Sequence, residues 1–330
     1  MERANSAPTE CAKCDREAVT HAAYAGTHLC GDHLVRSVEK RIRRRIREDD
    51  LLPATASPDD PVTWVVGLSG GKDSVVLSTV LAETFGRDPR VELVALSIHE
   101  GIEGYRDASL DACEELVADL GIAHRTVSYA EELGVEMDDV AAEDPLDMNP
   151  CGYCGPFRRD LLERHATDLG ADLLLTGHNL DDEAETALMN VFEGDVARIG
   201  NHYDASLGPM DDRDTSGPFV PRAKPLRDVP ESEVGLYAHL RDLPVHAVEC
   251  PHAAESFRAE VQELLHRVEE RHPGTRHSIM AGYEELAGLA ADRARGDDDP
   301  DLGECAECGA PTGAEVCRSC RLVDAVGGER

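Results

Sequence analysis

The stretch Thr63-Trp-Val-Val-Gly67-Leu-Ser69-Gly-Gly-Lys-Asp-Ser74 decides how this chain is expected to fold. Its first five residues are apolar and mostly β-branched, so they predict a buried strand. The glycine-rich loop from Ser69 to Ser74 follows, and residues 75–85 have the pattern of a helix. A strand, a tight loop and a helix in this order predict one unit of a parallel α/β sheet.

The same alternation continues on both sides of this unit. Further strands are predicted over residues 91–98, 124–128, 172–176 and 244–248, and further helices over 106–120, 157–169, 181–192 and 254–271. The fold class is therefore α/β with a doubly wound parallel sheet, in which ligands bind at the carboxyl ends of the strands. Residues 194–221, rich in Gly, Pro and Asp, predict a mobile surface loop.

Composition limits the class of protein. The chain has 330 residues, 41% of them hydrophobic, but no run near the roughly 18 apolar residues of a membrane span. The N-terminus lacks the features of a signal peptide, so we expect a cytoplasmic protein with no membrane partner. The net charge of −33, with only four lysines, is typical of haloarchaeal proteins, whose salty solvent screens self-repulsion. Such a charge reports the solvent and does not exclude a nucleic-acid partner.

Eight of the side chains that can bind metals form two groups with the spacing of zinc sites. CxxC pairs in a cytosolic chain indicate metal ligands rather than disulfides. Each group supplies four ligands, enough for a closed tetrahedral site, so both zinc ions are expected to be structural. The first group is Cys11, Cys14, Cys30 and His33, and the second is Cys305, Cys308, Cys317 and Cys320.

Three further cysteines, Cys151, Cys154 and Cys250, suggest a different metal centre, whereas Cys113 lies in a helical pattern and is expected in the core. Three thiolates could hold a [4Fe–4S] cluster and leave one iron open to an exogenous sulfur or substrate atom. Two alternatives stay open on spacing alone: a redox-active CxxC pair, or a third zinc with His252 as fourth ligand.

The chain is predicted to have three parts. Residues 1–55 hold the first zinc module and an arginine-rich helix, residues 56–290 form the catalytic domain, and residues 291–330 hold an acidic linker and the second zinc module. Leu34, Val38, Ile42 and Ile46 give the basic helix one apolar stripe. Its arginines either contact RNA or form a solvated face.

The loop after the first strand carries the chemistry. Glycines let the backbone approach a phosphate closely, and N–H groups at a helix N-terminus favour negative charge. Ser69 and Ser74 can donate hydrogen bonds, and Lys72 supplies a positive charge. The spacing differs from that of the common GxxxxGK[ST] loop. A plain turn is the structural alternative.

This loop resembles the PP-loop of the ATP pyrophosphatases, which transfer AMP to a substrate oxygen and release pyrophosphate. The resemblance extends along nearly the whole chain. The CxxC…CxxH module, SGGKDS, the segment from Cys151 to Arg159, the Gly177-His-Asn-Leu-Asp-Asp-Glu183 motif, Pro225-Leu226, Cys250 and the four-cysteine module occur in this order. Together they are similar to the tRNA 2-thiouridine synthetases of the TtuA/NcsA family.

The resemblance implies a tRNA uridine 2-sulfurtransferase that adenylates the uridine O2 and then replaces it with sulfur. Its implied cofactors are ATP, Mg²⁺, two zinc ions and a [4Fe–4S] cluster held by the three cysteines. Asp182 or Asp181 would be the acidic catalytic residue, with Asp182 favoured, as a metal ligand or a proton acceptor; both could instead simply cap a helix. Lys72 and Asp73 complete the catalytic set. The implied ATP-binding residues are Gly67, Ser69, Gly70, Gly71, Lys72, Asp73, Ser74, Arg158 and Gly177.

The implied partners are tRNA, a ubiquitin-like sulfur carrier that ends in a thiocarboxylate, and a second copy of the chain. The wobble uridine is favoured as the target, because thiolation of the T-loop uridine is a heat adaptation and this composition indicates salt. The alternatives are T-loop thiolation, a PP-loop enzyme that adenylates a small metabolite, and a non-catalytic zinc and RNA-binding protein. ATP-dependent release of pyrophosphate that requires tRNA would separate them.

Overall fold

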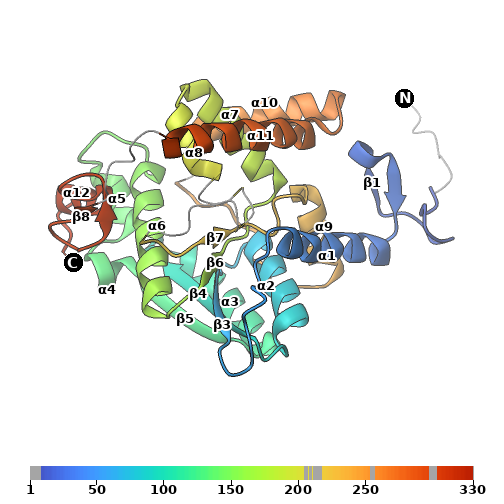
Figure 1. Cartoon of the computed structure of the whole chain (residues 1–330), viewed down its shortest axis with the longest axis horizontal. Helices are drawn as coiled ribbons and strands as arrows, with labels where there is room; N and C mark the ends of the chain where they lie inside the picture. The colour runs from blue at the N-terminus through green and yellow to red at the C-terminus, as the bar shows by residue number, and fades with distance from the viewer. Residues whose placement is uncertain are drawn as a thin grey trace.

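The computed structural model describes residues 9–203, 207, 210, 218–252, 257–296 and 303–329. Figure 1 shows a central sheet between helices, with one small module near α1 and another beside α6. Among the described residues, no helix combines the length and the apolar character that a bilayer span needs.

Five strands form the central sheet, in the order β5-β4-β3-β6-β7, and all four pairings are parallel. The chain leaves β3 toward β4 and β5 and later returns on the other side of β3 as β6. The prediction of a doubly wound parallel sheet is thus confirmed, and its switch point lies between β3 and β6. The strands are β3 Val62–Gly67, β4 Val91–His99, β5 Ala123–Ser128, β6 Leu173–Leu175 and β7 Arg222–Ala223.

The identity of the last strand differs from the prediction. Residues 244–248 form no strand; Pro244 has no N–H to give to a ladder, and the His246 N–H instead donates to the Gly70 carbonyl at 2.9 Å. The edge of the sheet is β7, whose Ala223 carbonyl accepts from the Thr176 N–H at 3.0 Å. Residues 244–248 therefore lie across the phosphate loop rather than in the sheet.

The predicted helices are present, and most begin slightly earlier than expected. The structure also has short helices within segments for which we expected none, including α8 within residues 194–221. Most of the acidic stretch 204–217 and residues 253–256 lie outside the described residues. The helices are α1 Gly31–Glu48, α2 Lys72–Phe85, α3 Arg106–Leu120, α4 Tyr129–Leu133, α5 Met137–Glu143, α6 Cys151–Asp168, α7 Leu180–Glu193, α8 Val196–His202, α9 Glu231–Leu240, α10 Phe257–Arg271, α11 Thr275–Gly296 and α12 Arg318–Ala325.

Two of these helices include residues that we expected to lie outside helices. Cys151 and Cys154 lie in the first turns of α6, not in a turn before it. Pro156 is tolerated there because its missing N–H removes only one early bond, the one to the Gly152 carbonyl. Helix α11 runs to Gly296, so residues 291–296, expected in an acidic linker, are helical.

The core lies on both faces of the sheet. Trp64 and Val66 of β3 pack in one cluster together with the apolar stripe of α1, and Val65 packs in the other with Phe157 of α6. Leu322 and Val323 of α12 belong to that second cluster. The short hairpins β1 Thr20–Ala22 with β2 Thr27–Leu29, and β8 Gly303–Glu304 with β9 Pro311–Thr312, belong to the cysteine modules. Both modules thus connect to helices that are anchored in the core.

Candidate active site

The loop between β3 and α2 is shaped by its own residues. Gly70 has φ +80°, and a Cβ there would lie 2.3 Å from the Ser109 carbonyl oxygen, so only glycine fits. The Ser69 N–H donates to Ser74 Oγ at 3.0 Å, and Ser74 Oγ donates to the Gly71 carbonyl at 3.0 Å. These bonds fold the loop over the first turn of α2, as a phosphate-binding loop requires.

A cavity of about 270 Å³ opens at this loop, at the carboxyl ends of β3, β4 and β6. Leu96 and Ile98 of β4 give it an apolar wall, and Thr176 and His178 lie on the β6 side. Most of the sequence-predicted site residues meet here. Those that line the cavity are Gly67, Ser69, Gly71, Asp73, Ser74, Arg158, Gly177 and Asp182.

Lys72 faces an adjoining cavity, which it lines together with Asp181 and Glu231. Its Nζ lies 2.9 Å from Asp73 Oδ2 and 2.8 Å from Glu231 Oε1. Burial opposes the charged form, but the two carboxylates raise the pKa of Lys72 above its ordinary value. The ammonium group is therefore held charged beside the phosphate loop.

Asn179 links the two acidic parts of the site. Its Nδ2 donates to Asp73 Oδ1 at 2.9 Å, and its backbone N–H donates to Asp182 Oδ2 at 3.0 Å. Its Oδ1 accepts from the Asp182 N–H, which completes a capping box at the start of α7. Asp182 therefore caps the helix and also faces the cavity, so the two roles considered for it are compatible.

The environments of Asp181 and Asp182 differ. Burial raises the pKa of Asp182 to about 7, and the charge of Asp73 adds to this shift. Asp181 instead accepts from the Glu231 N–H at 2.9 Å and pairs with Arg276 Nε at 2.9 Å. The cavity is lined by Asp182 and not by Asp181 among the described residues.

Glu100 is a site residue that the sequence reasoning missed. It is buried and lies at the end of β4, where its Oε1 pairs with Arg158 at 2.8 Å and its Oε2 with Arg106 at 2.7 Å. Arg106 Nη1 also donates to the Ser69 carbonyl at 2.7 Å. Glu100 thus fixes Arg158 relative to the phosphate loop. Its position two residues after a predicted strand was the available signal.

Gly177 brings the end of β6 against the start of α2. A Cβ at this position would lie 2.8 Å from the Ser74 nitrogen and 2.9 Å from the Asp73 carbonyl carbon. Both atoms belong to backbone, so neither can rotate away. The close approach explains why the residue that lines the cavity here is glycine.

We expect Gly177→Ala to raise the Kd for ATP by about tenfold or more, because relief of the clash displaces the phosphate loop at a cost of about 1–3 kcal/mol. Calorimetric titration with ATP measures the change. Gly282→Ala, in the exposed middle of α11 with open space around its Cβ, is the control and should leave ATP affinity unchanged. Unaltered ATP affinity in Gly177→Ala would contradict this role of the close approach.

The three remaining candidate ligands, Cys151, Cys154 and Cys250, lie beside this cavity. Cys154 and Cys250 pack on the same core cluster, and Cys151 Sγ lies 3.9 Å from the His252 carbonyl oxygen. Burial, and then the charges of the other two cysteines, raise the pKa of the Cys250 thiol. Arg158 Nη2 donates to Cys154 Sγ at 3.4 Å, so one guanidinium group contacts both Glu100 and the cysteine group.

The donor set fits an iron–sulfur cluster. His252 Nε2 lies 2.7 Å from Asp138 Oδ1, so only the other ring nitrogen, Nδ1, could serve a third zinc site. All three cysteines are free thiols, and a redox pair would use only two of them. A cluster ligated by three thiolates would have a single iron without a protein ligand.

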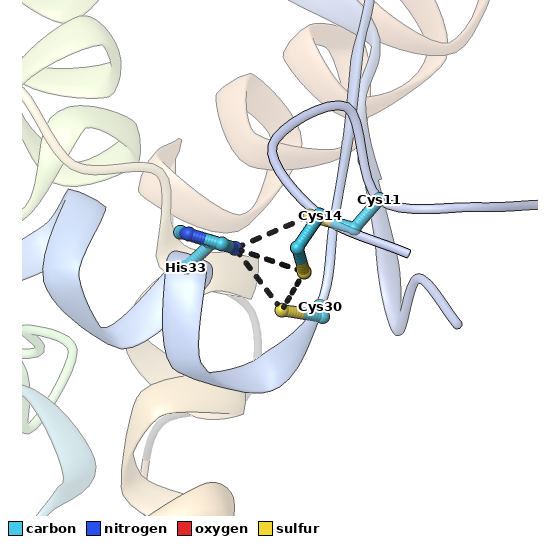
Figure 2. Close-up of side chains that lie close together, drawn as sticks. All are labelled: Cys11, Cys14, Cys30 and His33. Carbon is cyan, nitrogen blue, oxygen red and sulfur yellow. Dashed lines mark hydrogen bonds between the residues drawn. The ribbon is translucent and has the colours of Figure 1, made fainter. Parts of the chain in front are cut away.

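Two groups of four ligands form closed sites at the ends of the chain. In the first, the His33 Nδ1 atom lies 3.3–3.5 Å from the sulfurs of Cys11, Cys14 and Cys30, as Figure 2 shows. Although burial opposes it, backbone N–H groups of Cys30 and Lys13 lower the pKa of the Cys11 thiol to about 6. The site therefore favours a thiolate, which is the form that binds a metal ion.

The second group has the same character. Its sulfurs lie 3.8 Å apart in the pairs Cys305–Cys320 and Cys308–Cys317. This spacing is too long for a disulfide but equals the edge of about 3.8 Å of a tetrahedron with zinc–sulfur bonds of about 2.3 Å. In each group all four ligand atoms lie within 4.8 Å of one another. Each group can therefore hold one tetrahedrally coordinated ion.

Several arginines of α1 form ion pairs within the protein. This differs from both expectations for the basic helix, which were RNA contact and a solvated face. Arg41 pairs with Glu233 of α9, and Arg45 pairs with Asp228 at 2.7 Å and with Asp49 at 3.2 Å. These pairs join α1 to the segment before and within α9. The basic helix is therefore, at least in part, a packing surface within the protein.

Known proteins resemble this chain over nearly its whole length. Residues 38–244 match the PP-loop domain family, and residues 10–35 match the family described as the N-terminal LIM domain of the 2-thiouridine synthetase TtuA. The tRNA 2-thiolation protein NcsA of Haloferax volcanii is 65% identical over 317 residues, which cover 96% of this chain and 99% of that protein. Cytoplasmic tRNA 2-thiolation protein 1 of Caenorhabditis elegans is 34% identical, with 94% and 79% covered.

A solved structure shares the architecture as well. It is described as the U34-tRNA thiolase NcsA from Methanococcus maripaludis with its [4Fe-4S] cluster. The TM-score is 0.78 at 33% identity, and the match covers 96% of this chain and 95% of that one. The similarity thus includes the sheet, the phosphate loop and both cysteine modules.

Proposed function

Because the chain belongs to the family of PP-loop tRNA 2-thiolation proteins, we propose that it adenylates a tRNA uridine with ATP and replaces the 2-oxygen with sulfur. The observation that carries this proposal is Arg158, which contacts Glu100 in the wall of the cavity and Cys154 outside it. A phosphate site and a cysteine group are thereby held side by side, as a reaction with two consecutive steps at one uridine needs.

The first step is nucleotidyl transfer. The uridine O2 attacks the α-phosphorus of ATP, a new O–P bond forms, and the bond to the leaving pyrophosphate breaks. Backbone N–H groups of the loop and the Lys72 ammonium stabilise the charge that develops on the phosphates. Asp73 and Asp182 face each other across Asn179 and would hold Mg²⁺ there. We assign Asp182 rather than Asp181 to this role, since Asp181 is engaged by Arg276.

The second step is displacement of AMP by sulfur at C2 of the uridine. The Cys151, Cys154 and Cys250 thiolates would hold a [4Fe–4S] cluster. When bound, such a cluster supplies an iron that can carry a sulfur atom. Arg158 lies between this sulfur side and the cavity, where its charge favours the phosphate of the departing AMP. The apolar wall formed by Leu96 and Ile98 limits water at the activated carbon.

The remaining parts of the proposal concern metals and partners. We assign one structural zinc ion to each four-ligand group. We favour the wobble uridine, as the name of the Methanococcus maripaludis relative supports, and a ubiquitin-like thiocarboxylate as sulfur donor in the cytoplasm. Exposed apolar side chains on α7, α10 and α11 support a homodimer; they are Val191, Phe192, Phe257, Leu286 and Leu289.

Release of pyrophosphate that requires both ATP and unmodified tRNA tests the first step. Mass spectrometry of nucleosides from a deletion strain, with the position mapped, tests the target. We expect 2-thiouridine to disappear from the wobble position. Release of pyrophosphate in the absence of tRNA, driven by a small metabolite, would instead favour a PP-loop enzyme of another class.

We expect Asp182→Asn to be less active but more stable at pH 8. The raised pKa means that native Asp182 binds a proton between pH 4 and 7, where the same group in the unfolded chain, with its ordinary value of 3.8, has lost it. The contribution of Asp182 to the free energy of unfolding is therefore highest below pH 4. It falls as the pH rises from 4 to 7 and stays low above pH 7. Removal of the charge should gain about 2 kcal/mol at pH 8.

Chemical denaturation at pH 8 and at pH 4 measures this difference, which should vanish at the lower pH. Thiolation should fall by about 100-fold, as for loss of one charge-stabilising group. Asp119→Asn, an exposed carboxyl on α3, is the control for the general loss of one negative charge. Equal stability of Asp182→Asn and wild type at pH 8 would show that folding does not raise the pKa of this carboxyl group.

A further inference from the structure

Three arginines from three separate elements are grouped around α6, the helix that carries Arg158 and Cys154. Arg159 follows Arg158 on α6, and its Nη1 lies 3.5 Å from the position of a Cβ on Gly155. Arg222 of β7 donates from Nη2 to Glu163 Oε2 at 2.8 Å, one turn further along α6. Arg318 is the first residue of α12, which packs against α6 (Figure 1).

The positive charge of this group is only partly balanced. Glu163 pairs with Arg222, but within the described residues no carboxylate lies within 4.0 Å of the Arg159 or Arg318 guanidinium. Both side chains are exposed. Desolvation, and then the charges of Arg222 and Arg318, lower the pKa of Arg159. A chain with 66 acidic and 33 basic residues thus keeps like charges together at one place, which costs stability unless an anion binds there.

We propose that Arg159, Arg222 and Arg318 form a binding surface for the phosphate backbone of the tRNA whose uridine enters the cavity. The proposal rests on the proposed function, because a tRNA substrate is what brings a chain of phosphates past the opening of the cavity. A uridine that reaches the phosphate loop carries its flanking nucleotides with it, and their backbone must pass over the rim of the cavity. Arg159 directly follows Arg158, which lines that cavity. The same helix carries Glu163, the partner of Arg222, and packs against α12, which begins with Arg318.

Guanidinium groups suit this task in the solvent that the composition indicates. At high salt the long-range attraction between a basic surface and RNA is screened. Short bidentate hydrogen bonds from arginine to phosphate depend on contact and are lost less. The tail of the sulfur carrier also approaches the cysteines, but its thiocarboxylate offers a single negative charge there. An RNA backbone offers one negative charge for every nucleotide, which suits three separate arginines better.

The C-terminal cysteine module has a definite part in this surface. Cys317 caps α12 and Cys320 lies in its first turn, so the ion held by this module would fix the helix that begins with Arg318. Leu322 and Val323 then anchor the same helix in the core. The module thus places one arginine of the surface relative to α6.

The test uses the full-length protein, purified anaerobically, and a fluorescent, unmodified tRNA transcript titrated over a series of KCl concentrations. We expect the double variant Arg159→Gln/Arg318→Gln to bind the transcript at least about tenfold more weakly than wild type. The slope of log K against log salt should fall by about one for each arginine. ATP affinity and zinc content should not change, which also establishes that the variant is folded.

Arg87→Gln is the matched control, because Arg87 is an exposed arginine in the loop that leads from α2 to the amino end of β4, whereas the cavity lies at the carboxyl ends of the strands. It should bind as wild type does. The single variants, which alter different helices, should each show about half of the loss in log K. They keep the proposal testable if the double variant loses its zinc.

The two levels of the proposal fail in different ways. Wild-type protein that neither binds nor thiolates the transcript would overturn the proposed function. Wild-type protein that thiolates it, together with a double variant of unchanged affinity and salt slope, would overturn the arginine surface alone. Unchanged tRNA affinity with weaker binding of the sulfur carrier would also overturn it, since the surface would then bind a protein.

Discussion

Replacement of Lys72 by alanine is expected to lower tRNA-dependent release of pyrophosphate by at least about 100-fold, while both zinc sites stay filled. Lys72 lies at the first position of α2 and is held charged between Asp73 and Glu231. The two four-ligand groups lie toward the two ends of the chain and share no residue with this loop.

The expected loss is large because removal of Lys72 does more than delete one positive charge. The Asp73 and Glu231 carboxylates would remain beside the phosphate loop without their shared counter-ion. Two uncompensated negative charges then repel the triphosphate, and the repulsion grows as charge develops on the phosphates in the transition state. Lys72→Arg keeps the charge but has a planar group with a different reach, so we expect it to recover only part of the rate.

Pyrophosphate release, ATP affinity and zinc content are the three measurements for this variant. Lys40→Ala, an exposed lysine on α1, serves as the control and should have wild-type ATP affinity. If Lys72→Ala thiolates tRNA at the wild-type rate, the assignment of the loop to ATP chemistry is wrong.

Features that depend on neighbours in sequence could be predicted from the sequence. The strand before Gly67, the turn at Gly70 and the helix that begins at Lys72 are set by local patterns. The same holds for the two four-ligand groups, since a CxxC pair presents both thiols to one point. Most of the predicted phosphate-site residues accordingly line one cavity.

Features that depend on contacts between distant segments could not be predicted in this way. Glu100 becomes a site residue only because α6 brings Arg158 to it. The segment 244–248 has an apolar, strand-like pattern, but the edge next to β6 is taken by β7. The choice between Asp181 and Asp182 depends on Arg276, which lies almost a hundred residues away in the chain.

We expect Cys250→Ala to lose iron and sulfur transfer while it keeps wild-type ATP affinity. Cys250 packs on the same core cluster as Cys154, although 95 residues separate them in the sequence. The neighbouring segment is fixed to the phosphate loop by the bond from His246 to Gly70. Pro251 favours an extended backbone at Cys250, which suits this crossing.

The two halves of this expectation have separate causes. A site with three thiolates has no spare protein ligand, so loss of one leaves the cluster labile. The phosphate loop is held by Ser69, Ser74 and Gly177. Within the described residues, none of their hydrogen bonds or close contacts involves Cys250. Iron content, the visible absorption band and ATP titration of anaerobically prepared protein measure the two effects independently.

Cys113→Ala separates this role from that of a cysteine in the core. Cys113 is fully buried on α3, and its thiol donates to the Leu68 carbonyl at 3.8 Å. Its loss should cost about 1 kcal/mol of stability and leave the iron content unchanged.

Wild-type protein should contain about two zinc ions and one four-iron cluster per chain. Full iron content and normal thiolation in Cys250→Ala would overturn the three-cysteine site, and the sulfur step would then need another origin.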